Sequence, residues 1–329
     1  MTSSLLSAIG RTPLVRLANL FANERGIRVY AKLEMLNPGG SAKDRPALRM
    51  LTEAWKDGRL APGATVVESS SGNTAISLAM ICAQLGLRLI CVVDPRTAGN
   101  NLAILQALGA SIDYVREPDP DTGEFLPARI NRARQLQAEI PGVFWTNQYG
   151  NEDNWRSHLE TMQEILDAAG PVDYVAGAVS TCGTMAGCAK KVRELGLPTR
   201  IVAVDSEASA ILGEGKGVRR FPGIGAGIVP PFGQTRFWDE AVTVSDREMV
   251  EGCRELALRE GLMAGPSSGG VIAAVRRLLP KMPDGAVCAL ILHDRGERYM
   301  DTVFSDEWVN RQFGDVESHD KEDETGCSS

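Results

Sequence analysis

The amino-acid sequence predicts an α/β protein whose twisted, mainly parallel sheets are covered by helices. Short runs rich in Val, Ile and Leu alternate with amphipathic segments of helical period along most of the chain. Strands that alternate with helices need crossover connections, and these build parallel sheets covered on both faces. Only 5% of the 329 residues are aromatic. The core must therefore be mainly aliphatic, as is typical of buried parallel strands.

Each predicted element is a short apolar run or a segment of helical period, and turn-forming residues separate them. In the first half we predict strands at 64–68, 89–93 and 111–115, and helices at 74–85 and near 100–108. In the second half we predict strands at 174–179, 201–205 and 286–292, and helices at 185–195, 246–260 and 271–279.

The length of the chain favours two lobes of ordinary size. We expect an N-terminal α/β lobe over residues 1–146 and a C-terminal α/β lobe over 147–312. Residues 12–35 are expected to contribute strands to the C-terminal lobe. The Gly- and Pro-rich stretch 213–231 is predicted to be a long functional loop. The polar, acidic stretch 313–329 has no apolar face to bury and is predicted to be disordered.

Composition and charge exclude several classes of function. The net charge is −7 and no basic cluster stands out, which disfavours binding to nucleic acid. No apolar stretch reaches the roughly 18 residues of a membrane span, and the N-terminus does not resemble a secretory signal. The seven cysteines are scattered and the three histidines are isolated, so we expect no metal site. A reducing cytoplasm fits this pattern.

Lys43 is the first candidate for catalysis. It follows the turn-forming residues 37–40 and stands where a helix is predicted to begin. The positive end of a helix dipole and neighbouring free N–H groups both disfavour a protonated amine. A lysine with a lowered pKa can form a Schiff base. The alternative is a solvated lysine on a helix surface.

Three further turns carry small hydroxyl residues at the start of a predicted helix, at residues 68–74, 179–184 and 264–270. The first two follow predicted strands. At the carboxyl end of a parallel strand, such a turn and the free N–H groups of the next helix can bind an anion. The first turn suits a substrate carboxylate and the second a phosphate. Each can also be an ordinary capped turn.

The order and spacing of these motifs resemble those of the fold type II pyridoxal-phosphate enzymes, the family of cysteine synthase and cystathionine β-synthase. The resemblance runs from residue 9 to residue 299. It implies a fold like that of the tryptophan synthase β-subunit, pyridoxal 5'-phosphate as the cofactor and a homodimer. It also implies replacement of the β-substituent of a serine-derived amino acid through an aminoacrylate intermediate.

The resemblance gives each motif a role. Lys43 is expected to hold the cofactor as a Schiff base and to move the Cα proton, Asn73 to bond the ring hydroxyl, and Ser267 to face the pyridine nitrogen. A serine does not enforce ring protonation, so it weakens the electron sink and favours β-elimination over transamination. The residues expected at the phosphate are Ser180, Thr181, Cys182, Gly183 and Thr184, and those expected at the substrate carboxylate are Ser69, Ser70, Ser71 and Gly72.

Departures from typical cysteine synthases, such as Ser180 and Asp294, resemble one branch of the family. That branch makes N-(2-amino-2-carboxyethyl)-L-glutamate from O-phospho-L-serine and L-glutamate, a route to the diaminopropionate of siderophores such as staphyloferrin B. A dicarboxylic amine must be held while its nitrogen points at the β-carbon. Arg129 as a bidentate clamp, with the hydroxyls of Tyr149 and Ser180, could hold it. The alternatives are a solvated helix arginine, a half-buried packing residue and a turn hydroxyl.

Two other functions stay open on the sequence. One is a cysteine synthase that combines O-acetylserine or O-phosphoserine with sulfide. The other is a catalytically degenerate paralogue that acts as a binding or regulatory protein. The presence of Lys43, Asn73 and Ser267 argues against the second of these.

Overall fold

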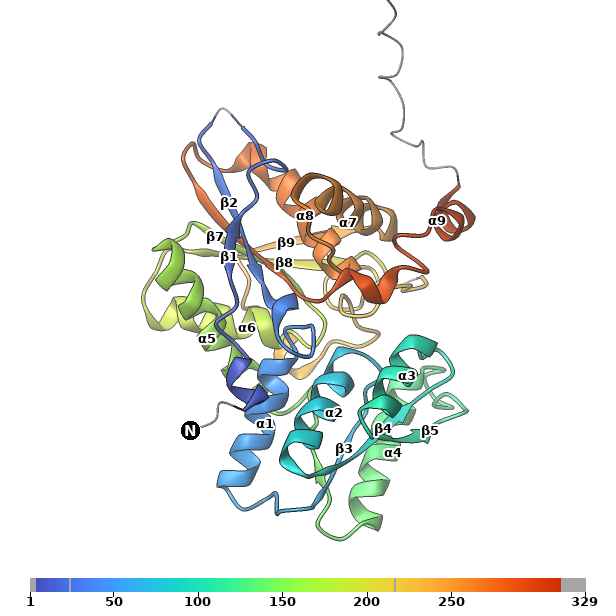
Figure 1. The fold of residues 1–329 in the computed structure, drawn as a ribbon. Helices are drawn as coiled ribbons and strands as arrows, with labels where there is room; N and C mark the ends of the chain where they lie inside the picture. Colours follow the sequence, from blue (N-terminus) through green and yellow to red (C-terminus); the bar gives the residue numbers. More distant parts are fainter. Residues whose placement is uncertain (1–3, 24, 216, 315–329) are drawn as a thin grey trace, which may run out of the picture.

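The described part of the protein contains two sheets, seen in the upper and lower halves of Figure 1. The structure is a computed structural model that describes residues 4–23, 25–215 and 217–314. In both sheets all neighbouring strands run parallel except the pair β1–β2. The larger sheet has the order β1 (Leu14–Arg16), β2 (Arg28–Leu33), β10 (Val287–Leu292), β7 (Tyr174–Ala178), β8 (Arg200–Ser206) and β9 (Glu240–Val244). The smaller has the order β5 (Ser111–Tyr114), β4 (Arg88–Val93), β3 (Thr65–Glu68) and β6 (Phe144–Trp145).

Helices cover both faces of each sheet. The α-helices are α1 (Asp44–Lys56), α2 (Asn73–Leu85), α3 (Gly99–Ala107), α4 (Phe125–Glu139), α5 (Asp153–Ala169), α6 (Gly183–Glu194), α7 (Asp246–Glu260), α8 (Pro266–Leu278) and α9 (Asp306–Phe313). Short 3-10 helices are η1 (Leu5–Ala8), η2 (Glu34–Leu36), η3 (Pro231–Gly233), η4 (Leu279–Lys281) and η5 (Gly296–Tyr299).

Alternation along the strands divides the hydrophobic core between the two faces of each sheet. In β8, Val202 and Val204 pack into the core under α7 and α8, whereas Ile201 and Ala203 pack into the core under α5 and α6. Successive side chains of a strand point to opposite faces, so a strand buried on both faces reads as a continuous apolar run. This explains why periodicity of two is absent from these strands in the sequence.

The predicted α/β class and the mainly parallel sheets are confirmed. Every strand predicted from the sequence is present, with ends shifted by one residue at most. The helix predicted at 271–279 begins five residues earlier, at Pro266, because proline fits the first turn of a helix, where its missing N–H costs nothing. The sequence did not indicate α5, which carries residues beneath the site described below.

A buried group of charges joins β2, α1 and α5. Lys32 is fully buried, and its Nζ lies 2.6 Å from Glu164 Oε2. Arg45, on α1, contacts Glu34 at 2.7 Å and Glu164 at 2.7 Å. Burial alone would raise the pKa of Glu34, but the bonds from Arg45 keep that pKa below its usual value. The group fixes α1, the helix that begins after Lys43, against the larger sheet.

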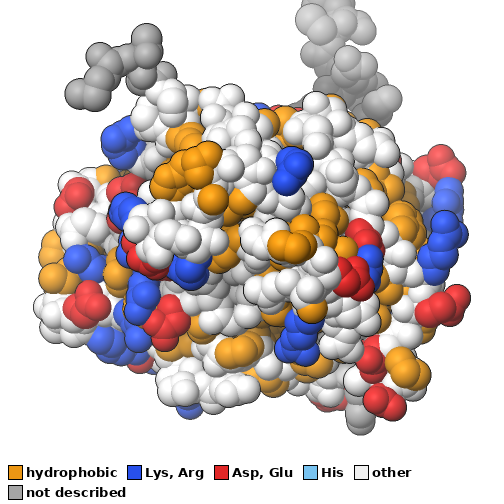
Figure 2. Space-filling model, turned by 90° about the horizontal axis from the view of Figure 1, so that it is seen from below, with side chains coloured by type: hydrophobic (Ala, Val, Ile, Leu, Met, Phe, Trp, Pro, Cys, Tyr) orange, Lys and Arg blue, Asp and Glu red, His pale blue; other side chains and the backbone are white. Residues whose placement is uncertain are grey.

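On the face shown in Figure 2, basic and acidic side chains of the described residues are interspersed with hydrophobic ones. Within the described part of the chain, no helix is both long and apolar enough to cross a membrane. The predicted disordered tail, 313–329, lies outside the described residues except for Phe313 and Gly314. Phe313 ends α9 and its ring lies 5.9 Å from that of Trp308.

Candidate active site

The candidate site lies where the carboxyl ends of parallel strands from both sheets meet. Turns that follow β2, β3, β7 and β10 converge there, as is general for ligand sites in parallel α/β proteins. All of the residues predicted to bind the cofactor line one narrow cavity, although their roles stay predictions. Its lining is Ser41, Ala42, Lys43, Asn73, Ala178, Ser180, Thr181, Cys182, Gly183, Thr184, Gly223, Ser267 and His293.

Lys43 caps the N-terminus of α1 and reaches into this cavity. Its amine makes no hydrogen bond and no ion pair with any described residue. Burial lowers the pKa of Lys43 to about 8, although the nearby Cys182 and Asp294 act in the opposite direction. A buried, unpaired amine with a lowered pKa is a nucleophile at neutral pH and can form an imine with an aldehyde.

Asn73 is held from both ends of its amide. Its Nδ2 donates to Asp294 Oδ2 at 2.9 Å, and its Oδ1 accepts a hydrogen bond from Arg298. The Tyr299 hydroxyl also donates to Asp294 Oδ2, at 2.7 Å. Burial raises the pKa of Asp294, whose other oxygen has no hydrogen-bond partner among the described residues. These contacts leave Asn73 one amide proton with which to bond a ligand.

The turn from β7 into α6 has the features of an anion site. Cys182 is in the left-handed region, at φ 67°, which is rare for residues other than glycine and is concentrated at functional sites. Gly183 opens α6, and a Cβ there would lie 2.1 Å from Asn154 Oδ1, so only glycine fits. The first N–H groups of a helix lack intrahelical partners and attract anions.

Side chains from α5 form hydrogen bonds to this turn. Asn154 Nδ2 donates to Thr181 Oγ1 at 3.2 Å and to the Gln148 carbonyl at 2.7 Å. His158 Nε2 lies 3.3 Å from Thr184 Oγ1. Burial holds the pKa of His158 well below its ordinary value, so the ring is neutral. Both α5 residues therefore orient the hydroxyls of the turn without adding charge.

His293 and Ser267 close the cavity on the side of β10 and α8. The backbone N–H of Ala178 donates to His293 Nε2 at 3.0 Å, which requires a neutral ring with its proton on Nδ1. Burial lowers the pKa of His293 to about 4, in agreement with this tautomer. Ser267 is buried, and its hydroxyl makes no hydrogen bond with a described residue. It is free to bond a ring nitrogen.

The residues predicted to bind substrate lie beside the cavity and, except for Ser180, do not line it. Ser69 to Gly72 form the turn between β3 and Asn73, and the Ser69 hydroxyl is buried without a partner. Arg129 Nε lies 3.2 Å from Asp94 Oδ2, and its Nη1 donates to Ser71 Oγ at 3.4 Å. Tyr149 is half-buried, and burial raises its pKa. Ser180 donates to the Gly225 carbonyl at 3.0 Å.

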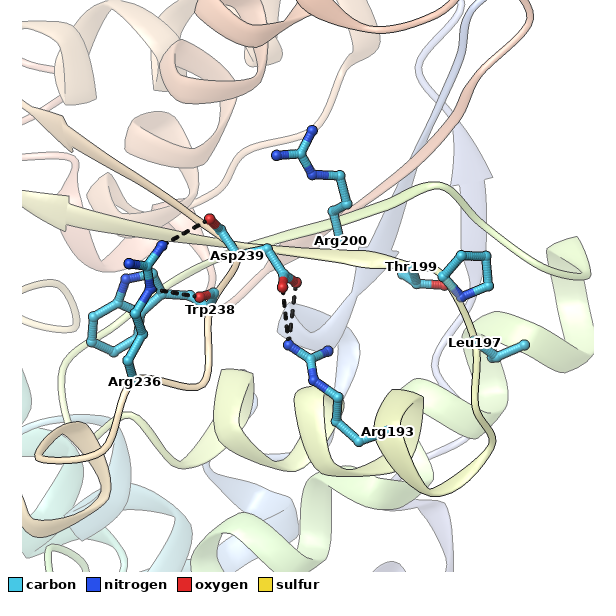
Figure 3. Close-up of a pocket in the computed structure, with 8 residues that line it drawn as sticks. Arg193, Leu197, Thr199, Arg200, Arg236, Trp238 and Asp239 are labelled. Carbon is cyan, nitrogen blue, oxygen red and sulfur yellow. Dashed lines mark hydrogen bonds and ion pairs between the residues drawn. The ribbon is translucent and has the colours of Figure 1, made fainter.

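A second hollow, of about 620 Å³, opens at the start of β8 (Figure 3). Its arginines already have partners in the protein. Arg193 contacts Asp239 at 3.1 Å, and Arg236 donates to the carbonyls of Trp238 and Asp239. Arg200 contacts Glu240 at 3.0 Å. The hollow offers no unpaired nucleophile, so the cavity at Lys43 remains the candidate site.

Comparison with known proteins identifies the family. The family described as "Pyridoxal-phosphate dependent enzyme" matches residues 5–294. This chain belongs to that family. The enzyme is 44% identical to N-(2-amino-2-carboxyethyl)-L-glutamate synthase of Ralstonia nicotianae over 315 residues. This alignment covers 94% of the chain and 92% of that protein. The resemblance inferred from the motifs is therefore confirmed.

Solved structures give the same result for the fold. The crystal structure of O-ureido-L-serine synthase matches with a TM-score of 0.84 and 34% identity, covering 92% of the enzyme and 95% of that chain. The O-acetylserine-dependent cystathionine β-synthase of Helicobacter pylori matches with a TM-score of 0.84 and 31% identity, and the match covers 92% of the enzyme and 98% of that chain. The predicted type II fold is confirmed, and the enzyme is pyridoxal-phosphate-dependent.

The donors around the cavity suit this cofactor. Lys43 would supply the amine for its aldehyde, the helix start at Gly183 would supply N–H groups for its phosphate, and Ser267 would supply a hydroxyl for its ring nitrogen. The free space between these side chains is small, about 20 Å³.

Sequence reasoning missed four residues that shape the site: Asn154, His158, His293 and Asp294. The hydrogen bonds of the two histidines to the turn and to β7 were not foreseen. The stretch 293–294 directly follows an apolar strand, as the predicted turns do. That position was the available signal for His293 and Asp294. No local pattern indicates Asn154 or His158, which lie inside α5.

Proposed function

We propose that the enzyme joins L-glutamate to the β-carbon of O-phospho-L-serine, giving N-(2-amino-2-carboxyethyl)-L-glutamate and phosphate. The observation that carries the proposal is the amine of Lys43, which has no partner among the described residues and lines the same cavity as the N–H and hydroxyl groups of the turn at 180–184. The 44% identity to a synthase of this name supports the choice of substrates. The names of two structural relatives, an O-ureido-L-serine synthase and an O-acetylserine-dependent enzyme, support a serine-derived first substrate.

The chemistry divides between the cofactor and the chain. When bound, pyridoxal phosphate supplies an electron sink for the Cα of the substrate. Lys43 first holds the cofactor, then takes the proton from Cα and later returns it. The nitrogen of L-glutamate forms a bond to the β-carbon, and the bond between the β-carbon and the phosphate oxygen breaks. One proton of the glutamate amine passes to solvent.

The turn at 69–72 is suited to hold the carboxylate of the first substrate. The buried Ser69 hydroxyl lacks a partner, and the turn leads into the N-terminus of α2. An unpartnered buried hydroxyl is costly unless a ligand satisfies it. Asn101 and Arg129 brace the turn through the carbonyl and hydroxyl of Ser71, at 3.0 and 3.4 Å. The turn is thus positioned before substrate arrives.

A product assay tests the proposal against its rivals. Purified protein loaded with pyridoxal phosphate is incubated with O-phospho-L-serine and either L-glutamate or sulfide, and products are identified by mass. We expect the glutamate adduct and free phosphate. Cysteine alone would make the enzyme a cysteine synthase. No product from either nucleophile, and no visible absorption after incubation with the cofactor, would identify a degenerate paralogue. The Lys43→Ala variant is expected to lose both absorption and turnover.

The assembly and location of the enzyme belong to the same proposal. We propose a homodimer that works in the cytoplasm, as expected from the family resemblance and from the scattered cysteines. Light scattering coupled to size-exclusion chromatography measures the mass in solution. A mass near 35.4 kDa, that of a single chain, would refute the dimer.

A further inference from the structure

Arg219 is an arginine without a direct partner among the described residues. It lies in the irregular stretch between β8 and β9 and is half-buried. Its guanidinium makes no hydrogen bond and no ion pair within the described part of the chain. The next residue, Arg220, contacts Asp246 at 3.0 Å and donates to Gln312 at 3.1 Å. Two adjacent arginines thus differ sharply, and only Arg219 is left free for a ligand.

The side chain of Arg219 runs along the glycine-rich segment at the rim of the candidate site. A Cβ built on Gly225 would lie 3.4 Å from Arg219 Cδ, and one built on Gly227 would lie 3.2 Å from its Nη2. Gly225 is bound to the site, because its carbonyl accepts the Ser180 hydroxyl at 3.0 Å. Gly223, two residues earlier, lines the cavity itself. The Arg219 side chain therefore lies beside the segment 223–227, which begins at the cavity lining and is bonded to Ser180.

No carboxylate near Arg219 forms an ion pair with it within the described part of the chain. Asp205 is close enough for Arg219 to lower its pKa, but its oxygens accept the N–H groups of Ser206 and Leu212, both at 2.9 Å. Tyr149 is also within the field of Arg219. Arg129, by contrast, has a carboxylate neighbour in Asp94. Of these two arginines near Tyr149, Arg219 is the one without a carboxylate partner.

We propose that Arg219 binds the side-chain carboxylate of the amine substrate. In a dicarboxylic amino acid the α-carboxylate is attached to the carbon that bears the nitrogen, so it must enter the cavity with the nitrogen. The second carboxylate lies farther from the nitrogen and reaches outward to the rim. A guanidinium forms paired hydrogen bonds with a carboxylate, which makes it selective for this group. The inference rests on the proposed function, because it assigns the second carboxylate of the proposed nucleophile.

Steady-state kinetics of the holoenzyme test this role with L-glutamate and L-glutamine as alternative nucleophiles. For Arg219→Ala we expect the KM for L-glutamate to rise about 10- to 100-fold, the loss typical of a hydrogen-bonded charge, and the preference over L-glutamine to disappear. The KM for O-phospho-L-serine stays within about twofold. Arg219→Lys recovers part of the preference because it keeps the charge. The matched control, Arg220→Ala, changes none of these values.

Two kinetic results would overturn the inference. One is an unchanged preference for L-glutamate in Arg219→Ala. The other is a raised KM for O-phospho-L-serine alone, which would place the leaving phosphate at this arginine. If the native enzyme forms no product from L-glutamate, the proposed function fails, and calorimetric binding of L-glutamate to the holoenzyme decides the inference. Binding that is lost in Arg219→Ala upholds it, whereas equal or absent binding in both proteins overturns it.

Discussion

Replacing Gly183 by alanine tests how tightly the anion-binding turn is packed against α5. A Cβ at this position would lie 2.1 Å from Asn154 Oδ1 and 2.6 Å from its Cγ. Real side chains do not tolerate such contacts, so the amide of Asn154 must move. It cannot move without loss, because its Nδ2 donates to Gln148 and Thr181.

The cost follows from these contacts. Overpacking of a buried site typically destabilises a protein by about 1–3 kcal/mol. Loss of the two hydrogen bonds of Asn154 adds about 1 kcal/mol each. We therefore expect Gly183→Ala to lower the free energy of unfolding by about 3–5 kcal/mol. The matched control is Gly99→Ala at the start of α3, where a Cβ meets nothing within 4 Å. Alanine there is neutral or stabilises by up to about 1 kcal/mol.

Urea unfolding of the apoprotein, followed by far-ultraviolet circular dichroism, measures both changes. The decisive comparison repeats Gly183→Ala in an Asn154→Ala background, where the obstructing amide is gone. We expect the cost of the glycine substitution to fall to about 1 kcal/mol or less, which is a large coupling energy between the two positions. An equal cost in both backgrounds would refute the packing argument and place the strain elsewhere.

Three more predictions concern titratable groups in the interior, and urea unfolding of the apoprotein measures each of them. The pKa of Lys43 is about 8 in the folded protein and 10.5 when unperturbed, so the protonated amine destabilises the fold at pH 7. Lys43→Met should therefore stabilise the protein at pH 7, and the gain in free energy of unfolding should shrink as pH rises from 8 to 10.5. A gain independent of pH contradicts this. The pKa of His293 falls from 6.5 to about 4 on folding, so stability is lost as pH falls between these values. His293→Phe should make stability less dependent on pH in this range, at a cost of about 1–3 kcal/mol because the Ala178 N–H loses its acceptor. Glu164→Gln should cost about 3–5 kcal/mol, because the buried Lys32 then keeps only the more distant Glu34, at 3.8 Å, as a counter-charge. The exposed Glu160→Gln, on the same helix, should cost little, and equal losses would refute the argument.

Much of the fold follows from local pattern. Apolar runs such as 287–292 and 174–178 are long enough for strands and too short for helices, and glycines at 86 and 261 end the helices before them in the left-handed conformation. The edge strand β9 and the two-residue β6 were not predicted, and β6 is too short to carry a recognisable period. Their pairing depends on partners far along the chain.

The candidate site divides in the same way. The sequence indicates Lys43, Asn73 and the turn at 180–184, because a hydroxyl- or glycine-rich turn before a helix is recognisable from its local composition. Asp294 was noted in the sequence only as a departure from related enzymes. Its hydrogen bond to Asn73 crosses 221 residues of sequence, and such a contact leaves no trace in either local pattern.

The sequence by itself determined the class of fold, the lysine and the turns that meet it, because helix periods, strand lengths and turn composition are local properties. The tertiary structure decided the protonation and pairing of these groups. Burial lowers the pKa of Lys43, Arg129 lies 3.2 Å from the carboxylate of Asp94, and Arg219 has no ion-pair partner among the described residues. These properties depend on which residues lie within a few ångströms in space, and only folding brings those residues together.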